Sequence, residues 1–138
     1  MKRTALTSTL ALLLTASSVI AHHSYGDYDR NAPVTLEGIV KHVQWANPHV
    51  VLTLESQTKG EYSIEWAAVF QLARQGIDTA PVKVGDHLII TGSINRNPEK
   101  RILTLLQEIR RPEDGWHWVR PNRASQTSTA KYIARLKV

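Results

Sequence analysis

The stretch PVTLEGIVKHVQWANPHVVLTLES, residues 33–56, decides the fold, because apolar and polar residues alternate along it on both sides of one turn. We expect its first half to form a strand over Val34–Trp45, in which the apolar phase changes at Gly38. A glycine at a phase change predicts a β-bulge, where one extra residue reverses the inward side of the strand. The first strand is therefore expected to bend sharply, as the strands of small barrels do.

A turn and a second strand complete this stretch. Trp45-Ala46-Asn47-Pro48 predicts the turn, because Pro48 fixes its own φ and favours extended geometry in the residue before it. The next strand is expected over His49–Glu55. Its predicted inward residues are Val50, Leu52 and Leu54, and its predicted outward residues are His49, Thr53 and Glu55.

The remaining elements follow from the same kind of pattern. Clean alternation predicts a third strand over Glu61–Trp66, with Tyr62, Ile64 and Trp66 on the apolar side. The composition then becomes helical over Ala67–Gln75, with one apolar face formed by Val69, Phe70, Leu72 and Ala73, and Gly76 is placed to end that helix. Two further strands are expected over His87–Asn95 and Arg101–Ile109.

Three strands, one short helix and two strands make up the element order of an OB-fold barrel. Another small β-barrel, such as an SH3-like one, is the alternative, and the helix between the third and fourth strands favours the OB order. We expect a mainly β, OB-like barrel over residues 34–111. An N-terminal arm over residues 22–33 would precede it, and a C-terminal tail over residues 112–138 would follow.

Residues 1–21 have the pattern of a secretory signal peptide. Lys2 and Arg3 form a basic start, the apolar run Leu6–Ile20 follows, and Val19-Ile20-Ala21 fits a cleavage site after Ala21. A cut after Ser18 is the alternative. The run is shorter than the roughly 20 residues that a membrane-spanning helix needs. We expect a periplasmic or secreted protein with no transmembrane segment in the mature chain.

Composition limits the function classes. The chain has no cysteine, which excludes disulfides and thiolate chemistry. Its formal net charge of +5 includes Lys2 and Arg3 of the predicted signal peptide, and this mild excess argues against nucleic acid as a partner. Much of the excess lies in the tail, which is predicted to be solvated; contact with anionic lipid or an acidic protein partner is the alternative.

Several short segments together are characteristic. They are Ala21-His22-His23-Ser24-Tyr25, Pro33–Gly38, Trp45-Ala46-Asn47-Pro48-His49-Val50 and Val84-Gly85-Asp86. With these segments the chain resembles an uncharacterised family of small exported bacterial proteins, a domain of unknown function with a His-His-Ser start and a Trp-x-Asn-Pro-His motif. The resemblance covers most of the chain from Ala21 to about Ile109 and implies export and a compact β domain. It implies no activity.

The predicted mature N-terminus offers metal ligands. Cleavage after Ala21 would make His22 the first residue, so its α-amine and its ring Nδ1 could chelate one ion. A further imidazole, beginning with the adjacent His23, would complete three nitrogen ligands, a set that suits Cu(II). The alternative is a flexible polar start without a metal.

Two more histidines are candidates. If the two strands pair through the Trp45–Pro48 turn, His42 and His49 both face outward on neighbouring strands, roughly 5 to 8 Å apart, and can share the ion. The alternative is two ordinary exposed strand residues. We expect His87 to be structural and Trp116 and Trp118, on either side of His117, to pack the tail against the barrel.

No Gly-rich phosphate loop, G-x-S-x-G elbow or H-E-x-x-H motif is present, so we expect no enzyme activity. The prediction is an exported, non-catalytic binding protein. The first hypothesis is copper held by His22, His23, His42 and His49. The alternative is a β-barrel module that interacts with a protein or ligand without metal.

Overall fold

The computed structural model describes residues 25–122. Its strands are β1 (Val34–Gln44), β2 (Val51–Ser56), β3 (Gly60–Glu65), β4 (His87–Ile94), β5 (Ile102–Arg111) and β6 (Trp116–Val119). Its helices are α1 (Val69–Ala73) and two single 3₁₀ turns, η1 (Tyr25–Asp27) and η2 (Pro98–Lys100). In this part of the chain no helix is long and apolar enough to cross a membrane.

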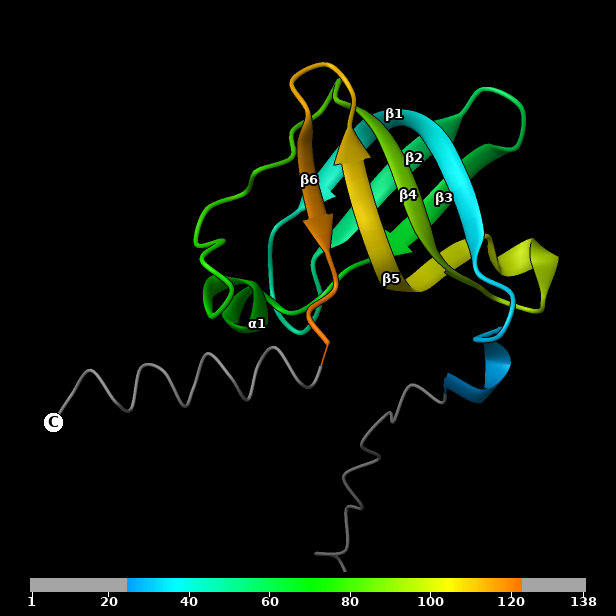
Figure 1. The fold of residues 1–138 in the computed structure, drawn as a ribbon. Coiled ribbons are helices and arrows are strands. Elements are labelled where there is room, and N and C mark those ends of the chain that lie inside the picture. Colours follow the sequence, from blue (N-terminus) through cyan, green and yellow to red (C-terminus); the bar gives the residue numbers. More distant parts are fainter. Residues whose placement is uncertain (1–24, 123–138) are drawn as a thin grey trace, which may run out of the picture.

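The strands form one sheet in the order β3-β2-β1-β4-β5-β6, antiparallel between neighbours. The sheet closes on itself because Ser63 and Ile64 of β3 pair in parallel with Ile102 and Leu103 of β5. Strands β1 to β5 thus make a closed barrel, with α1 between β3 and β4 in the chain and lying at one end of the barrel (Figure 1). The predicted OB-like barrel is confirmed.

The barrel interior is filled by the side chains that the alternation predicted. Val50, Leu52 and Leu54 are fully buried, and so is Ile64. Their outward neighbours on β2 include Thr53 and Glu55, which leaves a polar outer surface on this part of the barrel. The other large buried residues are Leu36, Val40, Leu72, Leu88, Ile90, Leu103, Leu106 and Ile109.

The predicted bulge lies elsewhere in β1. The register with β2 shifts between Val40 and His42, not at Gly38. Gly38 has a different role: a β-carbon at this position would lie 2.3 Å from the carbonyl oxygen of Glu55. Glycine is required there because the backbone of β2 crosses directly over it, and the phase change signalled this close approach as well as a bulge.

Helix α1 is shorter than predicted and buries less. Only Leu72 is fully buried, and Phe70 is 52% exposed, so the expected four-residue apolar face is wrong. The backbone N–H of Val69 donates to the side-chain oxygen of Asn47, which ties the start of the helix to the β1–β2 turn. Gly76, with φ of +82°, follows the helix as expected.

The predicted tail begins with a strand. Residues 116–119 form β6, which pairs with β5 from Glu108 to Arg111, beyond the part of β5 that pairs with β3. Trp116 and Trp118 both contact Trp66, with ring centroids 6.5 and 5.3 Å away, and Trp45 contacts it from 6.0 Å. The expectation that these tryptophans pack the tail against the barrel is confirmed for residues 116–119.

Candidate functional site

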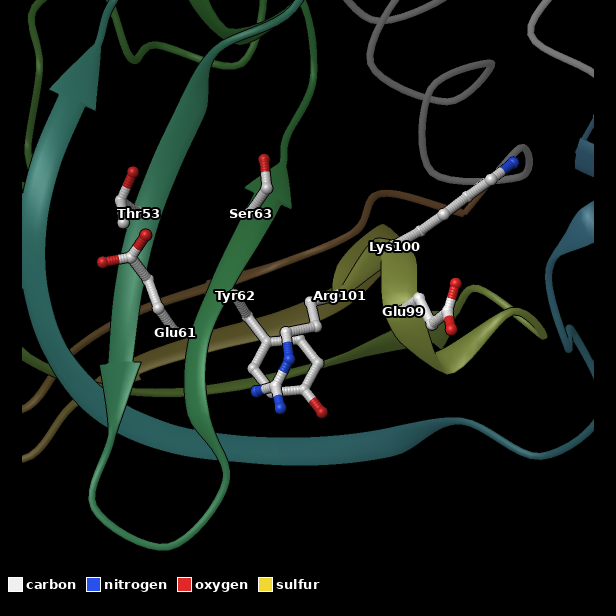
Figure 2. A pocket seen from close by; sticks show the side chains of 7 residues that line it. All are labelled: Thr53, Glu61, Tyr62, Ser63, Glu99, Lys100 and Arg101. Atoms are coloured by element: carbon white, nitrogen blue, oxygen red, sulfur yellow. The ribbon is translucent and has the colours of Figure 1, made fainter.

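A polar cavity lies on the outer surface of β2 and β3, beside the β4–β5 connection. Its volume is about 390 Å³. The residues that line it are Thr53, Glu61, Tyr62, Ser63, Glu99, Lys100 and Arg101. Figure 2 shows that β2 and β3 supply one side of it and that η2 and Arg101 supply the other. In OB-folds, the face of the second and third strands with the loop between the fourth and fifth is where ligands bind.

Arg101 is the most constrained of these side chains. Its guanidinium lies over the Tyr62 ring, 5.6 Å from the ring centroid (Figure 2). Its Nη1 donates to the carbonyl oxygen of Lys59. Its backbone is left-handed, with φ of 45°, and follows directly after η2. The stacking contact and the hydrogen bond come from β3 and from the β2–β3 turn, so they fix the guanidinium at the edge of β3.

A row of polar side chains crosses the outer face of the barrel beside this cavity. Ser63 pairs with Thr53 on β2, and Thr53 pairs with His42 on β1. Paired residues point to the same face, and here that face is the outer one. Thr53 and Ser63 are half-buried, whereas His42 is exposed. Two hydroxyls and one imidazole therefore line up across three strands, and the row ends at the cavity.

The charges in the cavity balance. Lys100 and Arg101 carry two positive charges, and Glu61 and Glu99 carry two negative charges. Lys100 also lies 3.9 Å from Asp27 of η1, a weak and exposed ion pair. Beside the cavity, Glu55 is paired with Lys41. The site consequently presents donors and acceptors in similar number, with no dominant sign of charge.

The end of the N-terminal arm is attached close to this site. The backbone N–H of Arg96, between β4 and η2, donates to the carbonyl of Asp27, and its guanidinium donates to the carbonyl of Gly26, each at a distance of 2.8 Å. Asp29 donates to Ile94, and Tyr28 bridges to Asn95. These bonds hold the arm from Gly26 onward against the β4–β5 connection.

The predicted metal ligands are not brought together by the described residues. His22 and His23 lie outside residues 25–122. The β1–β2 register places Thr53 opposite His42, and His49 precedes β2, four residues or about 13 Å along the chain from that position. The expected direct or diagonal pairing of His42 with His49 is wrong, because the connection between the strands runs from residue 45 to 50. Residues 25–122 contain no group of three or more side chains suited to a metal ion.

His87 has the structural role that the sequence predicted. Its Nε2 lies 2.8 Å from Oε1 of Glu37 on β1, and its Nδ1 lies 3.0 Å from Oε1 of Glu113 in the β5–β6 turn. The imidazole thereby links three separate segments of the chain. His117 is exposed on β6, on the side opposite to the two flanking tryptophans.

A second cavity, of about 360 Å³, lies between the chain before β4 and the β5–β6 turn. Its arginine, Arg111, makes four hydrogen bonds to the protein: one to Pro81, one to Asp86 and two to Asp114. The hydrogen bond with Asp114 raises the pKa of Arg111, and the same bond lowers the pKa of Asp114. Because four of the five N–H donors of Arg111 are already used, this cavity is less suited to a ligand than the one at Arg101.

The profile of a family of unknown function (DUF6152) matches residues 11–104. The chain belongs to this family. The DUF6152 match includes β1 to β4 and the start of β5, and with them every residue that lines the Arg101 cavity. No curated protein matches the chain.

Sequence reasoning missed this cavity of the DUF6152 domain. Thr53 was assigned only to the outward phase. Tyr62 was placed on the apolar side of its strand, and it does pack partly against the core, opposite Leu54, although it also lines the cavity. Arg101 was the first residue of a strand with no assigned role. The available signal was positional: once an OB order is expected, the second and third strands and the β4–β5 connection mark the face to examine.

Proposed function

We propose that the chain is a non-catalytic binding protein that holds a polar ligand on the β2–β3 face of its barrel. The observation that carries the proposal is the pre-set guanidinium of Arg101, held by the Tyr62 ring and the Lys59 carbonyl. A side chain fixed before binding loses little conformational entropy when a ligand arrives. Because a guanidinium carries five N–H donors, the bond to Lys59 leaves others for that ligand.

The site favours binding over chemistry. Its aliphatic hydroxyls, the nucleophiles that a histidine activates, are those of Thr53 and Ser63. Within residues 25–122, neither is hydrogen-bonded to a histidine, the arrangement that activates such a hydroxyl. Hydroxyls, carboxylates and a fixed arginine in a solvent-open cavity are instead the groups that orient a polar ligand.

Ligand titrations followed by amide NMR test this proposal. The probes are three neutral tetrasaccharides, a sulfated tetrasaccharide, an eight-residue oligothymidylate and a zwitterionic tripeptide. At least one of them should shift the amide signals of Thr53, Ser63 and Arg101 in a saturable manner. Arg101→Gln should weaken that response by about tenfold, the effect of losing one charge-assisted hydrogen bond.

The chain offers a matched control in Arg30, which lies 5.5 Å from the Tyr25 ring outside the cavity. Arg30→Gln removes the same kind of contact and should leave the titration unchanged. If no probe shifts the cavity residues, or if both variants weaken binding equally, the proposed site is wrong.

A second proposal concerns copper at the mature N-terminus, with export as its condition. The observation in its favour is the attachment of Gly26 and Asp27 to the β4–β5 connection. His22 is four residues before Gly26, so a chain that begins there ends within about 14 Å of a fixed point on the barrel. His22 and His23 would supply the chelate, and at most one of His42 and His49 could join them, because those two positions are separated along the sheet.

Calorimetry with Cu(II) on the processed protein tests this second proposal, after mass spectrometry has established that the chain begins at His22. Acetylation of the α-amine removes one of the two nitrogens of the His22 chelate and should weaken binding by at least tenfold. His42→Gln and His49→Gln show which imidazole joins. Equal affinity with and without the acetyl group excludes the chelate, and a chain retained in the cytoplasm excludes the export on which it depends.

A further inference from the structure

Strand β6 ends the sheet, and its outer edge is open (Figure 1). In the described part of the chain, β6 pairs with β5 and with no other strand. The backbone N–H of Arg120 donates to the carbonyl oxygen of Gln107 on β5, and main-chain groups alternate in direction along a strand. Trp118 therefore directs its N–H and its carbonyl at β5, whereas the same groups of His117 and Val119 point away from β5.

These outward main-chain groups are available to another strand. Within residues 25–122, no hydrogen bond engages the outward N–H and carbonyl groups of His117 and Val119. Both residues are exposed, and Val119 is 55% exposed although it is apolar. Unpaired main-chain groups at a sheet edge are a template for pairing with a further chain, which proteins usually block with charges, prolines or bulges. Residues 116–119 contain no Lys, Arg, Asp, Glu or Pro, and their pairing with β5 has no bulge.

We propose that β6 pairs with β6 of a second copy of this chain, antiparallel and about a two-fold axis. The outward groups determine the register. With His117 opposite Val119 of the second copy, and Val119 opposite His117 of the second copy, every outward N–H and carbonyl of both strands is bonded across the axis. Trp118 then lies opposite its own copy. If His117 lay on the axis instead, Val119 would face the turn before β6 and keep its groups unpaired.

The charges near this edge favour a second copy over the chain's own C-terminal residues. Arg120, directly after β6, forms no ion pair within residues 25–122. In the two-fold arrangement it lies opposite Trp116 of the second copy, next to the turn that carries Glu113 and Asp114, and the axis repeats this approach. Residues 123–138 contain four basic residues and no Asp or Glu, so they would bring no acidic side chain to Arg120. The second copy supplies one.

Hydrogen exchange on the processed protein, measured by amide NMR, tests the pairing. The amides of His117 and Val119 should gain protection as the protein concentration rises, whereas the Trp118 amide, which bonds β5, should be protected at every concentration. An edge of this length buries little surface, so the dimer should be weak and should appear in sedimentation velocity between about 10 µM and about 1 mM.

Val119→Pro tests the register. It removes the outward N–H of Val119 from each copy, which is half of the donors across the axis, and should weaken the dimer by about tenfold or more. Because that N–H does not bond β5, the barrel should be retained, as prolines are on sheet edges. Val119→Thr is the matched control: it keeps the N–H and the β-branched shape and should change the affinity by less than about threefold. Protection of the Trp118 amide reports whether each variant folds.

Arg120→Glu tests the charge argument. It replaces an attraction by a repulsion on both sides of the axis and should weaken the dimer by about fivefold at low salt. The effect should shrink when the salt concentration rises to about 0.5 M, because exposed charges are screened. An equal loss at both salt concentrations would contradict the placement of Arg120 beside the acidic turn.

The outcomes separate the possible occupants of the edge. Association with concentration-dependent protection of His117 and Val119 supports the proposal, and the exchange pattern of the unmodified protein decides even if Val119→Pro does not fold. Protection of both amides in a monomer assigns the edge to residues 123–138 and overturns the proposal. A chain that is monomeric at about 1 mM with both amides unprotected overturns it as well, and so does association that a folded Val119→Pro variant leaves unchanged.

Discussion

His87 on β4 and Glu37 on β1 are diagonal neighbours on two adjacent strands, with Nε2 of the imidazole 2.8 Å from Oε1 of the carboxylate. The opposite ring nitrogen, Nδ1, lies 3.0 Å from Glu113 in the β5–β6 turn. One side chain thus clamps two strands and the turn that leads into β6. The His87 side chain is 31% exposed, so water and salt weaken its interactions with both glutamates.

Replacement of His87 should therefore lower stability modestly. We expect His87→Ala to reduce the free energy of unfolding by about 1 kcal/mol, since it removes two exposed pairs together. Urea denaturation at low salt measures the change. Glu113→Ala alone should cost less, and in the His87→Ala background it should cost almost nothing, because its partner is already gone. Additive effects of the two changes would contradict the clamp.

The Arg111–Asp114 pair should make stability depend on acidic pH. The hydrogen bond from Arg111 lowers the pKa of Asp114 below its ordinary value of 3.8. A carboxyl with a lowered pKa in the folded state stabilises the fold above its unfolded pKa, and this stability is lost as pH falls through the folded value. Stability should decline as the pH drops below 3.8. Asp114→Asn should flatten that decline in urea titrations between pH 2 and pH 6, and an unchanged slope would remove the pair as its cause.

The core of the barrel was predictable because it depends on alternation, which is a local property. Val50, Leu52 and Leu54 are buried, as the alternation of apolar and polar residues along this segment predicted. The bulge between Val40 and His42 was not predictable, because the partner strand β2 sets the register and nothing in the sequence at Lys41 indicates a bulge. The phase change did single out Gly38. A glycine at such a position fits either a bulge or the close approach of another backbone, however, and only the position of Glu55 in the structure distinguishes the two.

The candidate site was hidden for a related reason. Arg101, Tyr62 and Lys59 meet because β5 closes the barrel against β3, a contact between segments far apart in the chain. No spacing in the sequence indicates it. The histidines, by contrast, drew attention as residue types, yet the register places His42 opposite Thr53 and away from His49. For the strand β6, four residues between a turn and a polar stretch gave too short a pattern to distinguish from a tail.

Gly38 should be among the positions least tolerant of substitution. In Gly38→Ala the new β-carbon would lie 2.3 Å from the carbonyl oxygen of Glu55, a contact with backbone that no side-chain rotation relieves. We expect a loss of about 3 kcal/mol or more, at the upper end of overpacking effects, measured by denaturant unfolding. Gly76→Ala is the matched control: nothing lies within 4 Å of its β-carbon, although its φ is +82°. It should lose only about 1 kcal/mol, from left-handed strain alone, and equal losses at the two glycines would exclude the backbone clash.

Trp66 and Trp118 allow a comparison of two buried indoles in one cluster. Trp66 is 4% exposed, and among residues 25–122 its Nε1 has no hydrogen-bond partner; Trp118 donates its Nε1 to Gln75 over 2.8 Å. Replacement by phenylalanine removes an unpaired donor in the first case and a satisfied one in the second. Trp118→Phe should therefore cost about 1 kcal/mol more than Trp66→Phe in the free energy of unfolding, the net value of one hydrogen bond. Denaturation followed by circular dichroism measures both, since it does not depend on the fluorescence that these changes alter. A Trp66→Phe variant that is the less stable of the two would show that the Trp66 donor is satisfied in solution.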